Sequence, residues 1–148
     1  PELVSRLRAI LGLEKPWRVA LVGAGRIGAA LFGYENFRRQ GFHIEAVFDT
    51  DPSKVGQKWN GLVVEADAGM ESALEERGIE IAVVAVPARA AQGVVDRLVA
   101  AGIRGILNFA PTQLEVPSGV VVKTVDMALE MEGLSYALSR AERASGAA

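Results

Sequence analysis

The stretch RVALVGAGRIGAALFGYENF, residues 18–37, contains the pattern that decides the fold. A short apolar run leads into three glycines spaced as G-x-G-x-x-G, namely Gly23, Gly25 and Gly28. The pattern alone is weak, but here it follows an expected strand and opens a helix expected over residues 26–40. In that context the first glycine permits a tight turn, the second lets the backbone approach a pyrophosphate, and the third lets helix and strand pack closely. The stretch therefore predicts a turn at which a helix N-terminus receives phosphates.

An acidic residue stands where a dinucleotide-binding turn needs one. Asp49 ends the strand expected over residues 43–48 and follows Gly28 by 21 positions. A carboxylate there accepts hydrogen bonds from both hydroxyls of an adenine ribose and repels a 2′-phosphate, which Lys54 would only partly offset. This spacing predicts NAD(H) rather than NADP(H) as the ligand. The plainer alternative, glycines that only close a tight turn, is disfavoured by the combination of strand, helix and acid.

Strands and helices alternate along the chain, which is typical of a parallel sheet with right-handed crossovers. We expect strands over residues 18–22, 43–48, 62–65, 81–86, 105–107 and 120–124, and helices over residues 3–11, 26–40, 70–77, 90–101 and 126–143. The predicted fold is α/β, a Rossmann-type doubly wound parallel sheet with a protruding C-terminal dimerisation helix. Its expected segments are a linker helix over residues 1–16, the Rossmann domain over residues 17–125 and the dimerisation helix over residues 126–148.

The last helix carries an apolar seam. Its members Met127, Met131, Leu134, Leu138 and Ala141 are spaced four, three, four and three residues apart. This spacing resembles that of a coiled coil, and Met and Leu suit a groove on another surface. A helix packed on its own sheet is the alternative. Because the helix follows the last strand of a compact domain, we favour a homodimer contact, formed by exchange between subunits or by simple packing.

Composition argues against several classes of function. The 148 residues are 50% hydrophobic, and 16 Lys and Arg stand against 18 Asp and Glu, so the net charge is −2. That balance argues against a nucleic-acid surface on this chain, since phosphates need clustered positive charge. The absence of Cys and the single His43 argue against disulfides, thiolate chemistry and a metal site. No apolar run approaches the length of a membrane span, so we expect a cytoplasmic protein without membrane contact.

The ligand is expected beyond the carboxyl ends of the strands, by the switch-point rule for such sheets. That places residues 86–88 and 108–111 over the dinucleotide, with Asn108 orienting a carboxamide and Phe109 near the nicotinamide. Phe109 is equally well explained as a core residue. The complete set of candidate dinucleotide-binding residues is Gly23, Ala24, Gly25, Arg26, Ile27, Gly28, Tyr34, Asp49, Thr50, Lys54, Val86, Pro87, Asn108, Phe109, Ala110 and Asp126.

No catalytic set accompanies this site. Hydride transfer to a carbonyl needs a positioned proton donor such as His, Lys or Tyr. His43 and Lys15 lie at the start of strands, at the far end of the sheet, whereas Tyr34, inside the first Rossmann helix, reaches toward the nicotinamide. Asp126 begins the last helix and is expected to cap it. The chain leaves little length for a substrate domain, so we predict a binding domain and not an enzyme, with no catalytic residue and no metal.

Two stretches resemble the nucleotide-binding domain of the Rex redox-sensing transcriptional repressors of bacteria. They are VALVGAGRIGAALFGYENFRRQGFHIEAVFDTDPSKVG, residues 19–56, and GIRGILNFAPTQLEVPSGVVVKTVDMALEMEGLSYAL, residues 102–138. The second is the more specific, through the pattern NFAP…L.VP…V.V..VD that ends at Asp126. The resemblance covers nearly the whole chain.

The resemblance implies a cofactor, a partner and a switch. Rex repressors bind NADH and NAD⁺ competitively at one site, and NADH binding to a homodimer with swapped C-terminal helices releases operator DNA. By resemblance, the glycine turn and Asp49 hold the cofactor, residues 108–111 line its nicotinamide end, and Tyr34 and Asp126 sense the charge of the ring. The resemblance starts after the family's N-terminal winged-helix domain, so we expect this chain to correspond to the C-terminal part of such a repressor. Operator DNA would therefore be contacted only through that N-terminal domain, to which residues 1–16 are the expected connecting helix.

Two other functions remain open. A small NAD-dependent oxidoreductase or imine reductase fragment would turn over a carbonyl or an imine, and the missing proton donor argues against it. A CoA-binding module, like the small subunit of an acyl-CoA ligase, shares the fold and a glycine-rich turn. Asp49 argues against this module because CoA carries a 3′-phosphate on the same ribose. Tight CoA binding without NADH binding would favour the module.

Overall fold

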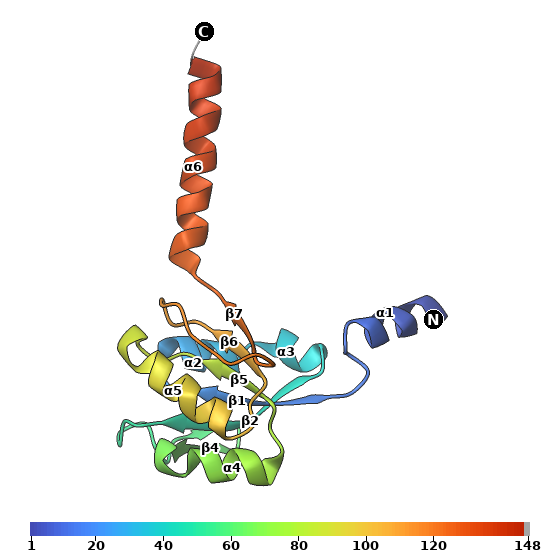
Figure 1. Ribbon diagram of the computed structural model, residues 1–148, viewed down its shortest axis with the longest axis vertical. Coiled ribbons are helices and arrows are strands. Elements are labelled where there is room, and N and C mark those ends of the chain that lie inside the picture. The colour runs from blue at the N-terminus through green and yellow to red at the C-terminus, as the bar shows by residue number, and fades with distance from the viewer. Residues whose placement is uncertain (147–148) are drawn as a thin grey trace.

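The computed structural model describes residues 1–146 and shows a seven-stranded sheet with helices on both faces (Figure 1). Residues 147–148, the end of the segment expected over 126–148, lie outside the described residues. The strand order is β3-β4-β2-β1-β5-β6-β7, and every neighbouring pair is parallel except the β3–β4 hairpin. The strands are β1 (Trp17–Val22), β2 (Phe42–Asp49), β3 (Lys58–Trp59), β4 (Leu62–Ala66), β5 (Ile81–Val84), β6 (Gly105–Asn108) and β7 (Val121–Thr124). This order confirms the predicted doubly wound α/β fold.

The helices divide between the two faces of the sheet. They are α1 (Glu2–Ile10), α2 (Arg26–Phe32), α3 (Glu35–Arg39), α4 (Met70–Arg77), α5 (Ala88–Ala100) and α6 (Met127–Gly146), with a short 3₁₀ turn η1 (Asp67–Gly69) before α4. Alternate residues of β1 point to opposite faces. Ala20 and Val22 pack with α4 and α5, whereas Val19 and Leu21 pack on the side of α2. Two hydrophobic layers therefore enclose the central strands.

The helix expected over residues 26–40 is wrong as one element, because the structure breaks it into α2 and α3. Gly33 ends α2, and Tyr34 is extended at ψ 97° before α3 begins. Glycine is a poor helix former, which favours a break at this point. The break also lets two aromatic pairs form, Phe32 with Trp59 at 5.3 Å between ring centroids and Tyr34 with Phe37 at 4.9 Å.

The β3–β4 hairpin was not expected from the sequence. Its turn is Asn60-Gly61, with φ of 50° and 84°, which is the dihedral pattern of a type I′ turn. An Asn-Gly pair between short strands is a strong hairpin signal, so the information was present in the sequence. The hairpin extends the sheet at the β4 edge and places Trp59 against Phe32.

The two terminal helices stand apart from the domain body. Figure 1 shows α6 rising away from the sheet and α1 extending sideways from the domain body. None of the twenty residues of α6 is buried, and α1 buries none of its own. Both helices confirm the expected helical segments, with α6 ending later than predicted. Within residues 1–146, no helix has the length and apolarity that crossing a membrane would require.

Candidate dinucleotide-binding site

The glycine turn joins the end of β1 to the start of α2, and its three glycines are needed for different reasons. Gly23 has φ 108°, and a Cβ there would overlap the carbonyl oxygen of Ala85 at the end of β5. A Cβ on Gly28 would overlap the carbonyl oxygen of Gly23. Gly25 differs: its φ is −78°, and a Cβ there would meet no atom within 4 Å. The fold itself therefore requires Gly23 and Gly28 but gives no reason for glycine at position 25.

Asp49 connects the glycine turn to the loop after β2. Its Oδ2 accepts a hydrogen bond from the Ala24 N–H at 2.7 Å, and its Oδ1 accepts one from the Asp51 N–H at 2.8 Å. Each carboxylate oxygen keeps a second lone pair, so the group can still accept ribose hydroxyls. Asp49 thus fixes the shape of the turn, in addition to the ribose contact that the sequence predicts.

A cavity of about 250 Å³ lies beyond the strand ends at this turn. Seven predicted residues line it: Gly23, Gly25, Asp49, Thr50, Lys54, Val86 and Pro87. The structure therefore brings together the residues predicted for the phosphate and adenosine portions of a dinucleotide. Arg26 and Ile27 begin α2 beside the turn, and Ala24 is buried under it.

The far wall of the cavity is formed by residues that sequence reasoning missed. Arg97 of α5 donates from Nη1 to the Asp67 carboxylate at 2.7 Å and from Nη2 to the Asp67 carbonyl at 2.6 Å. Its Nε donates to Glu71 of α4. Hydrogen bonds from Arg97 hold the pKa of Glu71 below its usual range, and those with Glu71 and Asp67 raise the pKa of Arg97. No motif marks these residues, since 30 positions separate Asp67 from Arg97.

The loop after β2 is shaped by a local acidic turn. Asp51 Oδ1 accepts hydrogen bonds from the Ser53 N–H at 2.9 Å and the Ser53 hydroxyl at 2.8 Å. These bonds, the backbone one first, hold the pKa of Asp51 below its usual range. The cavity rim therefore carries negative charge at Asp49, Asp51 and Asp67, against positive charge at Lys54 and Arg97.

The residues expected at the nicotinamide end do not line this cavity. Asn108 is fully buried: its amide nitrogen donates to the Ala110 carbonyl at 3.0 Å, and its Oδ1 accepts from the Ala110 N–H at 2.9 Å. The same amide also reaches the Thr112 carbonyl and the Thr124 hydroxyl. Asn108 thus fixes the loop after β6, and its role toward a carboxamide stays a prediction. Phe109 is half-buried and packs with the layer of Val19 and Leu21, which matches its alternative explanation as a core residue.

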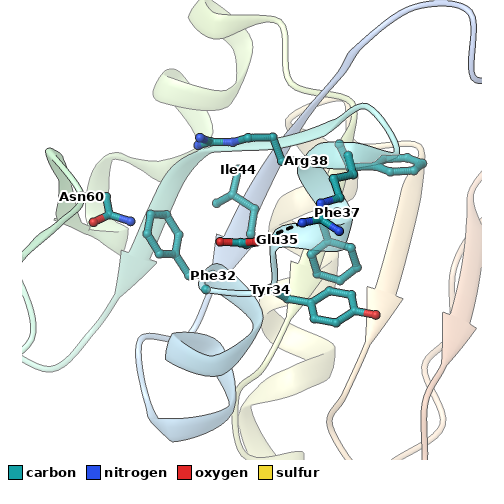
Figure 2. A pocket seen from close by; sticks show the side chains of 10 residues that line it. Phe32, Tyr34, Glu35, Phe37, Arg38, Ile44 and Asn60 are labelled. Carbon is teal, nitrogen blue, oxygen red and sulfur yellow. Dashed lines mark hydrogen bonds and ion pairs between the residues drawn. The ribbon is translucent and has the colours of Figure 1, made fainter.

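Tyr34 and Asp126 lie in other places. Tyr34 lines a separate cavity of about 360 Å³ beside α3, and Figure 2 shows its hydroxyl directed away from the other labelled side chains. Asp126 caps α6, since its Oδ1 accepts a hydrogen bond from the Leu129 N–H at 3.0 Å, as predicted. Within one chain neither residue shares the cavity of the glycine turn. Their redox role therefore stays a prediction, and one that needs a second subunit.

The described part of the chain contains no group of three or more His, Cys, Asp or Glu side chains arranged to hold a metal ion. The donor set around the cavity is suited instead to phosphates, hydroxyls and a flat base. Backbone N–H groups at the start of α2 and a carboxylate at the end of β2 are the recognition elements of a dinucleotide.

The fold and the site together define a Rossmann-type nucleotide-binding domain. A family model described as the CoA binding domain matches residues 14–112. The redox-sensing transcriptional repressor Rex of Roseiflexus sp. (strain RS-1) is 45% identical over 139 residues, which are 94% of this chain and 63% of that repressor. The chain thus belongs to the Rex family of redox-sensing transcriptional repressors, within the wider CoA binding domain family. This confirms the resemblance drawn from the sequence.

Solved structures agree with this assignment. The Rex-family repressor RSP in complex with β-NADH is 33% identical and superposes with a TM-score of 0.90, covering 99% of this chain and 71% of that one. RSP in complex with β-NAD⁺ and operator DNA is 34% identical, with a TM-score of 0.92 over 98% of this chain and 67% of that one. Coverage of 98–99% extends the match over the residues of α6. The chain spans 63% of the length of its Roseiflexus relative.

Proposed function

We propose that this chain is the NADH-sensing domain of a transcriptional repressor, with NAD⁺ competing for the same cavity. In the proposed mechanism, NADH binding to a dimer favours the arrangement that releases operator DNA. A ligand shifts such an equilibrium only through its different affinities for the two arrangements. The RSP complexes with β-NADH and with β-NAD⁺ and operator DNA support this proposal by relationship.

The observation that carries NAD(H) binding is the unexplained glycine at position 25. The fold accounts for Gly23 and Gly28, but a side chain at Gly25 would only project into open space beside the cavity. A missing side chain at the N-terminus of α2 lets a pyrophosphate approach the backbone N–H groups. Gly25 is therefore explained by the ligand rather than by the fold.

The charges around the cavity favour NAD(H) over dinucleotides that carry an extra phosphate on the ribose. Asp49 and Asp51 stand at the ribose position, and Lys54 is the cation on the same loop. The charge of Arg97 is already paired with the carboxylates of Asp67 and Glu71. A 2′-phosphate of NADP(H) or the 3′-phosphate of CoA would meet two carboxylates there. The CoA binding domain match makes CoA the second candidate ligand, and the titration described below separates it from NADH.

The proposed dimer uses α6. Its apolar seam at Met127, Met131, Leu134 and Leu138 is exposed, between 55% and 66% for each of these side chains. The domain body offers an apolar groove of about 270 Å³ on the face of α2 and α3, lined by Val19, Phe37, Phe42, Ile44, Ile81, Val83 and Leu107. We propose that α6 of one copy packs against the groove of the other. Such an exchange would bring the partner's end of α6 toward the first copy's ligand, where Asp126 and Tyr34 would sense the ring charge.

Operator DNA is proposed to be contacted by the longer protein and not by this chain alone. The net charge of −2 over 148 residues provides no general attraction to phosphates. A cytoplasmic location follows from the proposed action on DNA.

The test is a set of fluorescence titrations with NADH, NAD⁺, NADPH and CoA, combined with molar mass from light scattering. We expect a dimer that binds NADH more tightly than NAD⁺, binds NADPH and CoA weakly, and shows no turnover. Gly25→Ala should weaken NADH binding at least tenfold while leaving the melting temperature unchanged. Gly93→Ala, an exposed glycine on α5 outside the cavity, is the matched control and should bind as the wild type does.

Three results would contradict the proposal. CoA binding without NADH binding would make the chain a CoA module. Equal affinity for NADH and NAD⁺ would remove the sensing role. Wild-type affinity in Gly25→Ala would show that the glycine turn does not hold the ligand. Tyr34 and Asp126, the residues proposed to sense the ring charge, have a test of their own. Tyr34→Phe and Asp126→Ala should each lower the ratio of NADH affinity to NAD⁺ affinity. An unchanged ratio in both variants would show that these residues do not sense the ring.

A further inference from the structure

The part of the cavity lining that Asp67 and Arg97 form has hydrogen-bonding atoms without a partner. Arg97 uses one N–H of each nitrogen, so Nη1 and Nη2 each keep one further N–H. Asp67 accepts through Oδ2 and its carbonyl, and among residues 1–146 its Oδ1 has no hydrogen-bond donor. No buried side-chain polar atom in this range lacks a partner, so Asp67 Oδ1 is open to solvent or to a ligand. Arg97 lines the same cavity as Asp67. The wall therefore presents a free acceptor beside free donors.

The rest of this end of the cavity is apolar. Met70 is fully buried at the start of α4, and Ala90 and Val94 of α5 are half-buried. All three side chains line the same cavity as Asp67 and Arg97. Apolar walls with a few convergent polar groups suit a flat heterocyclic base, and a Met thioether packs well against an aromatic ring.

The order of groups along the cavity follows the order of parts in a dinucleotide. β4, β2 and β1 are neighbours in the sheet, so Gly25 after β1, Asp49 at the end of β2 and Asp67 after β4 follow in this order along the strand ends, and Arg97 is hydrogen-bonded to Asp67. In the proposed binding mode Gly25 lies at the pyrophosphate and Asp49 at the ribose. The base is attached to the ribose on the side away from the pyrophosphate. The atoms that meet the base are then those of the Asp67–Arg97 pair.

We propose that the Asp67–Arg97 pair reads the adenine base, an inference that rests on the proposed NAD(H) binding. Asp67 Oδ1 accepts a hydrogen bond from the exocyclic amine of adenine, and an Arg97 N–H donates to the neighbouring ring nitrogen. An adjacent donor and acceptor is the arrangement by which side chains recognise adenine through its amine and a ring nitrogen. Glu71 has a supporting position: it holds the Nε edge of Arg97 and lies outside the cavity lining.

Hypoxanthine provides the probe, because it differs from adenine at the atoms that the pair contacts. Its carbonyl oxygen replaces the exocyclic amine, so Asp67 Oδ1 would face a second acceptor. The experiment compares NADH with reduced nicotinamide hypoxanthine dinucleotide on the wild-type chain. Both dinucleotides have the same nicotinamide, phosphates and riboses. We expect NADH to bind at least about tenfold more tightly, in the range that one paired base contact provides.

Asp67→Asn then tests the residue itself. The amide can present either its oxygen or its nitrogen to the base. The ratio of the affinity for NADH to the affinity for the hypoxanthine dinucleotide should therefore fall toward one. Glu65→Gln is the matched control, because Glu65 forms a comparable ion pair with Arg77 at 2.7 Å outside the cavity. It should keep the wild-type ratio. The wild-type ratio needs no variant, so the inference can be tested even if a variant folds poorly.

Each outcome decides a separate question. Wild-type affinities within twofold of each other overturn the adenine-reading role and leave NAD(H) binding intact. A wild-type ratio retained in Asp67→Asn also overturns it, because the discrimination then comes from another residue. Failure of the wild-type chain to bind either dinucleotide overturns the proposed function together with this inference.

Discussion

The two faces of the sheet are built differently. On the face of α4 and α5, helices of eight and thirteen residues cover the strands, and side chains such as Phe48, Leu74 and Leu98 are completely buried. On the other face, α2 has seven residues and α3 has five. They leave the apolar groove over β1, β5 and β6. The first face is complete within one chain, and the second is not.

The difference follows from where the chain goes after β7. In a doubly wound fold, a helix after the last strand is available to cover the incompletely covered face. Here that helix is α6, and it rises away from the domain body (Figure 1). An exposed apolar helix and an exposed apolar groove in the same chain are complementary surfaces. One chain supplies both, which is the requirement for a reciprocal, two-fold contact.

The largest expected effect is a loss of stability when a leucine is shortened to alanine, and this loss should differ between the two faces of the sheet. Leu98→Ala on the closed face should cost about 2–5 kcal/mol, because the cavity it leaves cannot be filled. Leu107→Ala in the groove should cost about 1 kcal/mol in the monomer, since this side chain is only half-buried. Urea denaturation at low protein concentration measures both. Equal losses would mean that the groove is a packed core and that the comparison between the faces fails.

The second effect concerns the proposed dimer. Leu134→Asp on the seam of α6 should weaken self-association at least a hundredfold, about 2.7 kcal/mol, because it places a charge at a side chain that the proposed dimer would bury. Sedimentation at several concentrations measures the dissociation constant. The control is Tyr136→Asp, which places the same charge on the opposite side of the same helix and should leave the dimer intact. A dimer that survives Leu134→Asp but not Tyr136→Asp would assign the interface to the other side of α6.

The smallest effect lies on the closed face, where Arg97 joins α5 to α4 and η1. Arg97→Leu should lower stability near neutral pH by about 1 kcal/mol or less, since ion pairs with partly exposed partners are screened. Arg97 depresses the pKa of Glu71 from 4.5, so the pair stabilises the fold above that pH. This contribution is lost as the pH falls through the lowered folded-state pKa. Melting temperatures of the two proteins should therefore converge in acid, and a constant difference down to pH 3 would exclude this origin.

The sequence was most informative where spacing along the chain determines structure. Gly23, Gly25 and Gly28 with Asp49 predicted the turn and its place at the sheet edge, because each position depends on one βαβ unit. The break at Gly33 and the Asn60-Gly61 hairpin were missed although both carry local signals. Those errors belong to the interpretation rather than to the sequence.

Other features had no local signal. The Arg97 contacts to Asp67 and Glu71 arise only when α4 and α5 pack side by side, across separations of 30 and 26 residues. Asp49 accepts hydrogen bonds from two backbone N–H groups, and these bonds depend on the conformations of two loops. A single sequence does not determine such contacts, because any charged residue at those positions would fit an exposed helix or loop equally well.

The double hydrogen bond of Asp49 also bears on how quickly the domain responds. The carboxylate joins the turn to the loop through hydrogen bonds within the protein, and a site held in this way leaves less backbone for a ligand to order, which lowers the entropic cost of the proposed association. Association is then limited mainly by encounter, at similar rates for the reduced and the oxidised ligand. A difference in affinity between the two must lie mostly in how long each one stays. For the proposed NADH sensor, the speed of response to a change in redox state would therefore be set by the residence time of the departing nucleotide.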